Sequence, residues 1–250
     1  FCNKLWNAAR FVLMNTEGLD EGAAEYSAAD RWIRARMDET TRAMHKHFAT
    51  YRLDLAVQAI YDFTWREFCD WYLELSKPVL QSDDSSAEQR RGTRRTLIET
   101  LEAILRLLHP LMPFITEEIW EQVGPRAGID GDTIMLRPYP EPDDAAADDA
   151  AVADIEWVKQ FIVGIRQIRG EMDISPGKAL PVLLQHASES DRARAAEHAL
   201  LLQRVGRVES VDIVDGEPPT AATALMGDLR LLDPMKGLMD VDADQARLDK

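Results

Sequence analysis

Apolar residues recur at helical spacing over most of the first 125 positions, and this periodicity limits the possible folds more than any other feature. In residues 1–14, Leu5, Ala9, Val12 and Leu13 form one inward stripe. Similar stripes predict helices over about 27–50, 53–76 and 88–108, and a short one beginning near Thr116. A chain with this pattern folds as a helix bundle.

Capping and breaking residues divide the helical stretch. Ser27 followed by Asp30 resembles a capping box, and Thr116 is a second candidate N-cap. Pro78 is expected to end the third helix, because proline lacks an N–H and clashes with the preceding turn. Residues 133–136 are a candidate short strand.

The pattern changes after an acidic stretch. Residues 141–156 hold seven Asp and Glu and no Lys or Arg, which predicts a solvated linker. Beyond it we expect helices over 155–171 and 190–203 and strands over 180–184, 208–214 and 223–232. The predicted fold is therefore mainly α: a helix bundle over 1–140, a linker over 141–154 and a small α+β domain over 155–239.

Charge is distributed unevenly along the chain. The net charge is −15, but residues 1–52 carry eight Lys and Arg against seven acids, so the remainder carries −16. Any surface that binds a polyanion is thus expected near the amino end.

Cys2 and Cys69 are too few for a disulfide framework, are expected to be buried, and favour a reducing, cytoplasmic location. No apolar run reaches the eighteen residues that a membrane span needs.

Motifs for bond-making chemistry are missing from the sequence. His45 and His47 are two positions apart on a predicted helix, so they diverge and do not suit a shared metal. Residues 170–178 have six residues between their glycines, where a phosphate-binding loop has four. We predict no catalytic residue and no metal ligand.

A polar stripe on the first helix is the remaining candidate site. Asn3, Asn7, Arg10 and Met14 follow one another at i, i+4, i+7 and i+11, beside Lys4, Trp6 and Phe11. Such a mixture can stack on unpaired bases and hydrogen-bond their edges. The alternative is an ordinary bundle helix with its polar residues outside and Trp6 in the core.

Several segments, in order along the chain, resemble bacterial valyl-tRNA synthetases, which are class I aminoacyl-tRNA synthetases. FCNKLWNAARFVLMNTEG (1–18) is similar to the start of their anticodon-binding helical domain, and DFTW (62–65) with EFCDWYLELSKP (67–78) to its third helix. LHPLMPFITEEIW (108–120) is similar to a stretch shared by the valine, isoleucine and leucine enzymes. WVK (157–159), MDISPGK (172–178) and PMKGL (234–238) again resemble the valine enzyme.

This resemblance implies a module that binds the anticodon of tRNA(Val) and is joined to a catalytic domain of the same polypeptide. The full enzyme attaches valine to tRNA with ATP and Mg²⁺, but the signature sequences that handle ATP are missing from these residues, so no cofactor is expected here. The chain starts without Met inside a helical pattern, and residues 240–250 resemble the start of a truncated coiled-coil arm, so we expect a piece of a longer protein.

The resemblance and the stripe together nominate the residues that contact tRNA. Arg10 is the best single candidate, and Lys4 is a phosphate partner. Phe11 and Trp32 could stack on bases, with burial in the core as the alternative for each. Arg31 and Arg34 are expected to face the same groove. The predicted anticodon-binding set is Asn3, Lys4, Asn7, Arg10, Phe11, Met14, Arg31, Trp32 and Arg34.

Two alternatives remain open at this stage. The bundle could be a structural module that docks the catalytic domain while bases are read elsewhere, in which case the stripe should be buried. It could also belong to an isoleucine- or leucine-type relative, because no amino-acid pocket lies in these residues.

Overall fold

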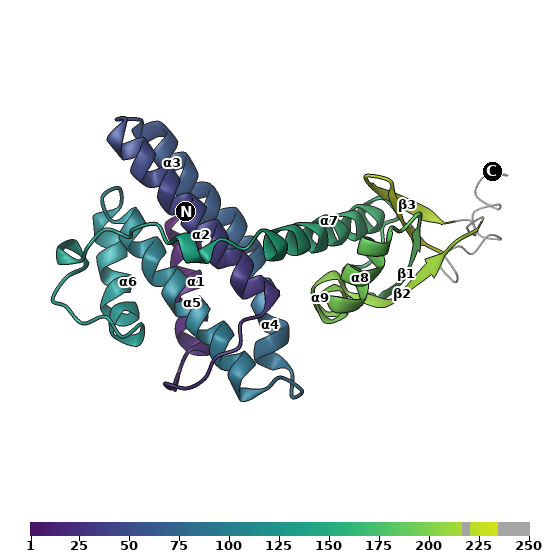
Figure 1. Cartoon of the computed structure of the whole chain (residues 1–250), viewed down its shortest axis with the longest axis horizontal. Helices are drawn as coiled ribbons and strands as arrows, with labels where there is room; N and C mark the ends of the chain where they lie inside the picture. Colours follow the sequence, from purple (N-terminus) through teal and green to yellow (C-terminus); the bar gives the residue numbers. More distant parts are fainter. Residues whose placement is uncertain (217–220, 235–250) are drawn as a thin grey trace, which may run out of the picture. The chain divides into compact units, whose positions relative to one another are not determined.

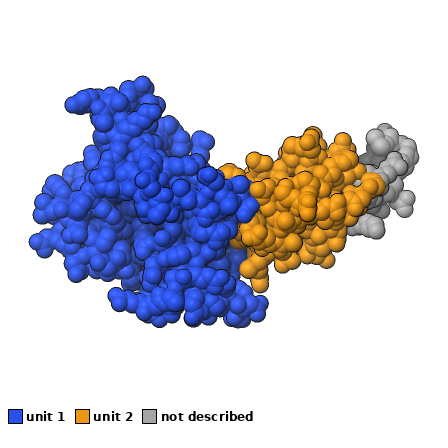
Figure 2. All heavy atoms as spheres, in the orientation of Figure 1, with its two compact units in different colours: residues 1–155 blue, residues 156–250 orange. Residues whose placement is uncertain are grey.

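The computed structural model describes residues 1–216 and 221–234, which form parts of two compact units. Unit 1 comprises Phe1–Ile155 and unit 2 comprises Glu156–Lys250 (Figure 2). The predicted arm start at 240–250, and all but the first residue of the 234–238 segment, lie outside the described residues. Among the described helices, none is long and apolar enough to cross a membrane.

Unit 1 is built mainly from helices (Figure 1). Its core contains large side chains with almost no exposed surface, including Leu5, Trp32, Phe68, Leu101 and Trp120. The elements are α1 (Cys2–Asn15), α2 (Ala28–Ala49), α3 (Leu53–Asp62), the π-helical η1 (Phe63–Tyr72), α4 (Leu73–Gln81), α5 (Ala87–Leu108), α6 (Pro113–Arg126) and the 3-10 turns η2 (Ile134–Leu136) and η3 (Asp144–Ala146).

A four-stranded mixed sheet forms the second unit together with helices. After α7 (Asp149–Glu171) come β1 (Leu180–Gln185), α8 (Glu189–Glu197), α9 (Ala199–Gly206), β2 (Val208–Val214), β3 (Ala222–Met226) and β4 (Leu229–Asp233). The strand order is β2-β1-β4-β3, with β1 parallel to β2 and antiparallel to β4. The predicted fold class, mainly α with a small α+β part, is confirmed.

Three predictions for elements of the bundle are wrong. The segment 133–136 is a 3-10 turn instead of a strand, because the Glu117 carboxylate accepts hydrogen bonds from the Thr133 hydroxyl and the Ile134 N–H. Helix α6 begins at Pro113, a residue suited to a first helical position, so Thr116 lies inside it. Pro78 is buried inside α4, which continues to Gln81.

The later elements differ from the predictions in smaller ways. Helix α7 starts at Asp149, within the stretch predicted as linker. A break at His198 divides the predicted helix 190–203 into α8 and α9. The predicted strand 223–232 is a hairpin of β3 and β4, turning at Gly227 with a φ of 62°.

A buried carboxylate fixes the start of α2. Asp30 forms the predicted capping box with Ser27, and its side chain also accepts hydrogen bonds from Tyr72 Oη at 2.6 Å and Thr93 Oγ1 at 2.9 Å. Burial raises the pKa of the Asp30 carboxyl, while the hydrogen bonds from Tyr72 and Ser27 lower it. Asp30 thus joins α2 to η1 and α5.

Close backbone contact holds the segment before α2 against α5. A Cβ on Gly92 would lie 2.0 Å from the carbonyl oxygen of Glu25, so only glycine fits there. The Glu25 N–H also donates to the Glu88 carbonyl at 3.0 Å. This contact sets where α2 begins relative to α5.

Tyr72→Phe should destabilise the chain by about 2 kcal/mol, because a buried carboxylate loses a charge-assisted hydrogen bond. The loss in free energy of unfolding is measured from the shift of the urea denaturation midpoint, with the m-value unchanged. Tyr139→Phe is the matched control: its hydroxyl donates to the neutral Leu107 carbonyl at 3.2 Å, so its loss should be smaller. Equal losses would contradict the role assigned to Asp30.

Gly92→Ala should destabilise the chain by about 1–3 kcal/mol, because the added methyl group forces α5 and the Glu25 backbone apart. Gly170→Ala in α7 is the control, since nothing lies within 4 Å of its Cβ position and alanine favours helix. Thermal unfolding of both variants measures the difference. A neutral Gly92→Ala would show that this backbone contact is loose.

Candidate nucleic-acid interface

Helix α1 has one buried and one exposed stripe, as its sequence predicts. Leu5, Ala8, Ala9 and Val12 are buried. The opposite stripe, Asn3, Asn7, Arg10 and Met14, is exposed, with Met14 73 % accessible. Trp6, which the bundle-only alternative puts in the core, is 44 % exposed. The expectation that Cys2 is buried is also wrong, because it lies at the exposed start of the helix.

The polar groups of this exposed stripe have no partners within the described parts of the chain. Asn3, Asn7 and Arg10 make no side-chain hydrogen bond, ion pair or ring contact there. Their amide and guanidinium groups therefore remain available to a ligand.

Lys4 and Phe11 lie on the flank of α1 that faces η1 and α4. The Lys4 ammonium pairs with Asp70 and lies 4.0 Å from the centre of the Trp65 ring. Phe11 is half-buried, with the Lys77 ammonium 5.8 Å from its ring centre. Both side chains are thus already engaged within the bundle.

The π-helical geometry of η1 brings Trp65 and Asp70 to the same lysine. In an α-helix, residues five apart point in different directions, whereas a π-helix closes its turns between residues i and i+5. Ten successive residues, Phe63–Tyr72, adopt this form. Cys69 lies in the same stretch, and burial raises the pKa of its thiol to about 11, so it stays protonated at neutral pH.

Three aromatic rings stack beside Lys4. The Tyr61 and Trp65 ring centres are 5.7 Å apart with an interplanar angle of 16°, and Phe1 lies 5.3 Å from Tyr61 and 6.4 Å from Trp65. Tyr61 is 38 % exposed, so the group offers an open edge. The sequence analysis missed this cluster, although the i, i+4 spacing of Tyr61 and Trp65 is a signal for it.

The prediction that Trp32 stacks on a base is wrong. Its side chain is completely buried in the core, where no nucleotide reaches it. An aromatic ring on the inward side of a long amphipathic helix gains more from burial than from remaining at the surface.

Arg31 and Arg34 do not share a groove with α1. They line a groove of about 580 Å³ between α2, α5 and the segment around residues 140–148, and no α1 residue contributes to its lining. Arg34 pairs with Glu99 and lies over the Tyr26 ring, with its guanidinium carbon 4.3 Å from the ring centre. Burial raises the pKa of Glu99, and the Arg34 charge opposes that rise.

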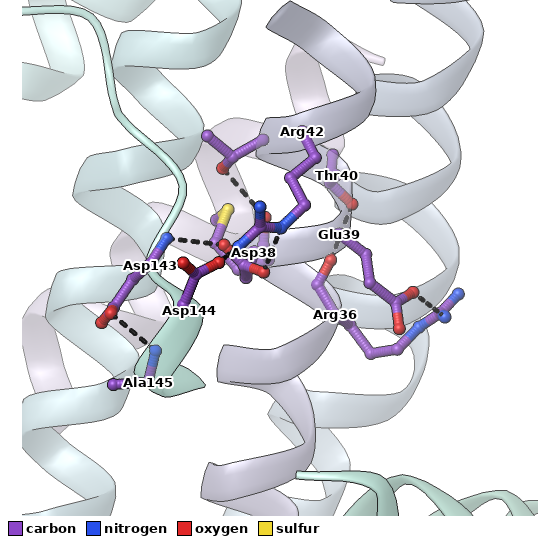
Figure 3. A network of polar contacts seen from close by, with 10 residues as sticks. Arg36, Asp38, Glu39, Thr40, Arg42, Asp143, Asp144 and Ala145 are labelled. Carbon is purple, nitrogen blue, oxygen red and sulfur yellow. Dashed lines mark hydrogen bonds and ion pairs between the residues drawn. The ribbon is translucent and has the colours of Figure 1, made fainter. Parts of the chain in front are cut away.

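The acidic segment, residues 141–148, lies along α2 instead of forming a free linker. Figure 3 shows the Arg42 guanidinium between the Asp38 and Asp144 carboxylates, with Asp143 beside Asp38. The Asp143 N–H donates to Asp38 Oδ1 at 2.7 Å, and hydrogen bonds to both carboxylates raise the pKa of Arg42. Attraction between the acids of the segment and the arginines of α2 explains this docking. The prediction of a solvated linker considered only the charge of the segment itself.

The described surface therefore offers two kinds of binding group. On α1 there are partnerless amide and guanidinium groups next to an aromatic cluster, which suit unstacked bases. On α2 there are arginines, which suit carboxylate or phosphate. These groups support binding by hydrogen bonds, stacking and charge.

A comparison with known protein families finds a match over much of the chain. The family described as the anticodon-binding domain of tRNA ligase matches residues 30–184, more than half of the chain. The matched region begins at residue 30, near the start of α2, and ends at residue 184 in β1, whereas α1 precedes it. The mainly helical fold agrees with this match, and the chain belongs to the anticodon-binding domains of class I tRNA ligases.

Proposed function

We propose that this chain is the anticodon-reading module of a valine-tRNA ligase and that the exposed stripe of α1 reads bases of tRNA(Val). The observation that carries the proposal is the set of partnerless groups at Asn3, Asn7 and Arg10. The valine type rests on the sequence resemblance at 1–18 and 62–78.

The chemistry of the stripe matches the edges of unpaired bases. An asparagine amide both donates and accepts, so it can pair with a base edge, and an arginine fork donates two parallel hydrogen bonds. Met14 supplies an adaptable apolar contact. The exposed edge of the Phe1–Tyr61–Trp65 cluster offers a ring on which a splayed base stacks, which contributes about 1–3 kcal/mol per base.

In this proposal, bond-making takes place in another part of the polypeptide. Valine activation and transfer require ATP and Mg²⁺, and we assign them to a catalytic domain joined to this module. The module supplies selection of the tRNA. The division is physically reasonable because base reading needs preorganised hydrogen-bonding groups, while adenylation needs a site for triphosphate and metal.

The proposed function predicts discrimination between anticodons. A tRNA(Val) transcript should bind more tightly than one with an altered anticodon, by about 1–3 kcal/mol for each base read directly. The measurement is a fluorescence titration at several salt concentrations, because phosphate contacts alone respond to salt without discriminating.

Two outcomes of this titration would contradict the proposal. Equal affinity for both transcripts at every salt concentration would leave the domain without a reading role at α1 and favour the docking alternative. Preference for tRNA(Ile) or tRNA(Leu) transcripts over tRNA(Val) would instead indicate an isoleucine- or leucine-type relative.

Arg10→Ala should weaken binding of tRNA(Val) by about 1–3 kcal/mol and reduce anticodon discrimination, because a guanidinium that meets a base edge is lost. Arg10→Lys keeps the charge and removes the fork, so it should restore little discrimination. Arg52→Ala is the matched control: it removes an exposed arginine that pairs with Asp54 beyond α2. Unchanged binding by Arg10→Ala, with helicity intact by circular dichroism, would defeat the assignment.

A further inference from the structure

A second cationic stripe runs along α2, apart from the α1 face. Arg31, Arg34, Asp38, Arg42 and His45 follow one another at i, i+3, i+7, i+11 and i+14, so they share one side of the helix. At 1.5 Å per residue the stripe is about 21 Å long. Asp38 is its single acid.

The acidic segment covers this stripe at successive points. His45 Nε2 lies 2.7 Å from the Pro140 carbonyl oxygen, and Asp38 accepts the Asp143 N–H. Beyond them, Asp144 pairs with Arg42 and Asp148 pairs with Arg31 Nε at 2.9 Å. The carboxylates therefore meet the arginines in the way that phosphates of a nucleic-acid strand do.

The contacts fall into an anchor and an exchangeable part. Backbone hydrogen bonds to Arg106, His45 and Asp38 hold residues 138–143, and the Asp38 carboxylate is itself buried. The two ion pairs that follow are more exposed: the Asp144 side chain is 95 % exposed, and Arg42 and Arg31 are 45 % and 46 % exposed. Asp148 is 29 % exposed, and its carboxylate also accepts the Ala151 N–H at the start of α7. Exposed ion pairs of this kind stabilise little and are weakened by salt.

Space remains between the segment and the helices. The groove of about 580 Å³ is lined by Arg31, Arg34 and Arg106 and by the small residues Ala145–Ala147, together with acids on both sides, among them Glu99 of α5 and Asp148 of the segment. Small side chains give the stretch between Asp144 and Asp148 few apolar contacts to lose when it moves away.

We infer that the α2 stripe is a second tRNA-contacting surface, which binds the sugar-phosphate backbone, and that the acidic segment is an internal competitor for it. A phosphodiester strand displaces Asp144 and Asp148 from Arg42 and Arg31 while residues 138–143 stay anchored. The inference rests on the proposed function in that the ligand is tRNA, but it does not depend on base reading by α1. Backbone contacts carry no sequence information, so this surface contributes equally to any tRNA.

The test compares two double variants in the 250-residue chain. Asp144→Asn with Asp148→Asn removes both competing charges. Asp132→Asn with Asp149→Asn is the matched control, because it removes two exposed acids that have no ion pair or side-chain hydrogen bond within the described residues. Each is titrated with a tRNA(Val) transcript and with the altered-anticodon transcript, with circular dichroism as the check on folding.

The D144N/D148N variant should bind both transcripts about three- to tenfold more tightly than the control, as expected for two exposed ion pairs no longer opposing the RNA. Its affinity should also fall more steeply with salt, by about one to two units in the slope of log K against log salt concentration. Arg31 and Arg42 are then no longer neutralised by carboxylates, so their contacts with phosphate release more counterions. Adding Arg31→Ala and Arg42→Ala should abolish the gain.

Two results would overturn the inference. One is an affinity equal to that of the control; the other is a gain that persists without Arg31 and Arg42, which would be a general charge effect. The ratio between cognate and altered transcripts reports separately on the proposed function. A gain for both transcripts with a ratio of one would retain the α2 surface and reject base reading by α1.

Discussion

The position of α2 depends on one buried carboxylate, and the arginine-bearing surface of the bundle depends on α2. Asp30 accepts hydrogen bonds from Ser27, Tyr72 and Thr93, which belong to three separate parts of unit 1. A carboxylate without solvent is stable only when donors surround it, so these elements must meet at one point. With its start fixed there, α2 packs against η1 and α5, and Arg31 and Arg34 lie along the groove that it forms with α5.

The sequence predicts correctly those features that depend only on residues close together along the chain. The capping box at Ser27 and Asp30, the two faces of α1 and the strand at 180–184 follow from nearest neighbours and periodicity, and the structure has all three. The exposure of Asn3, Asn7 and Arg10 was predictable for the same reason, since it needs only the phase of one helix.

Features that depend on distant residues could not be predicted in this way. The aromatic cluster joins Phe1 to Tyr61 and Trp65, and only the i, i+4 pair of Tyr61 and Trp65 within it has a local sequence signal. The docking of residues 141–148 joins Asp144 to Arg42 across about a hundred positions, so a composition argument classed the segment as solvated. For Trp32 the sequence leaves both stacking and core burial open, and the structure has it completely buried.

The wide turns of η1 also determine how α3 and α4 are rotated about their common axis. Each i→i+5 turn contains more residues than an α-helical turn, so ten such residues change the angular offset between the segment before Phe63 and the segment after Tyr72. If η1 were α-helical instead, α4 would be rotated about the helix axis. That rotation would move Lys77 away from the Phe11 ring and Pro78 out of the interior. The π-helical form of η1 therefore sets which residues of α4 face the core, while η1 itself buries Phe63, Phe68 and Tyr72.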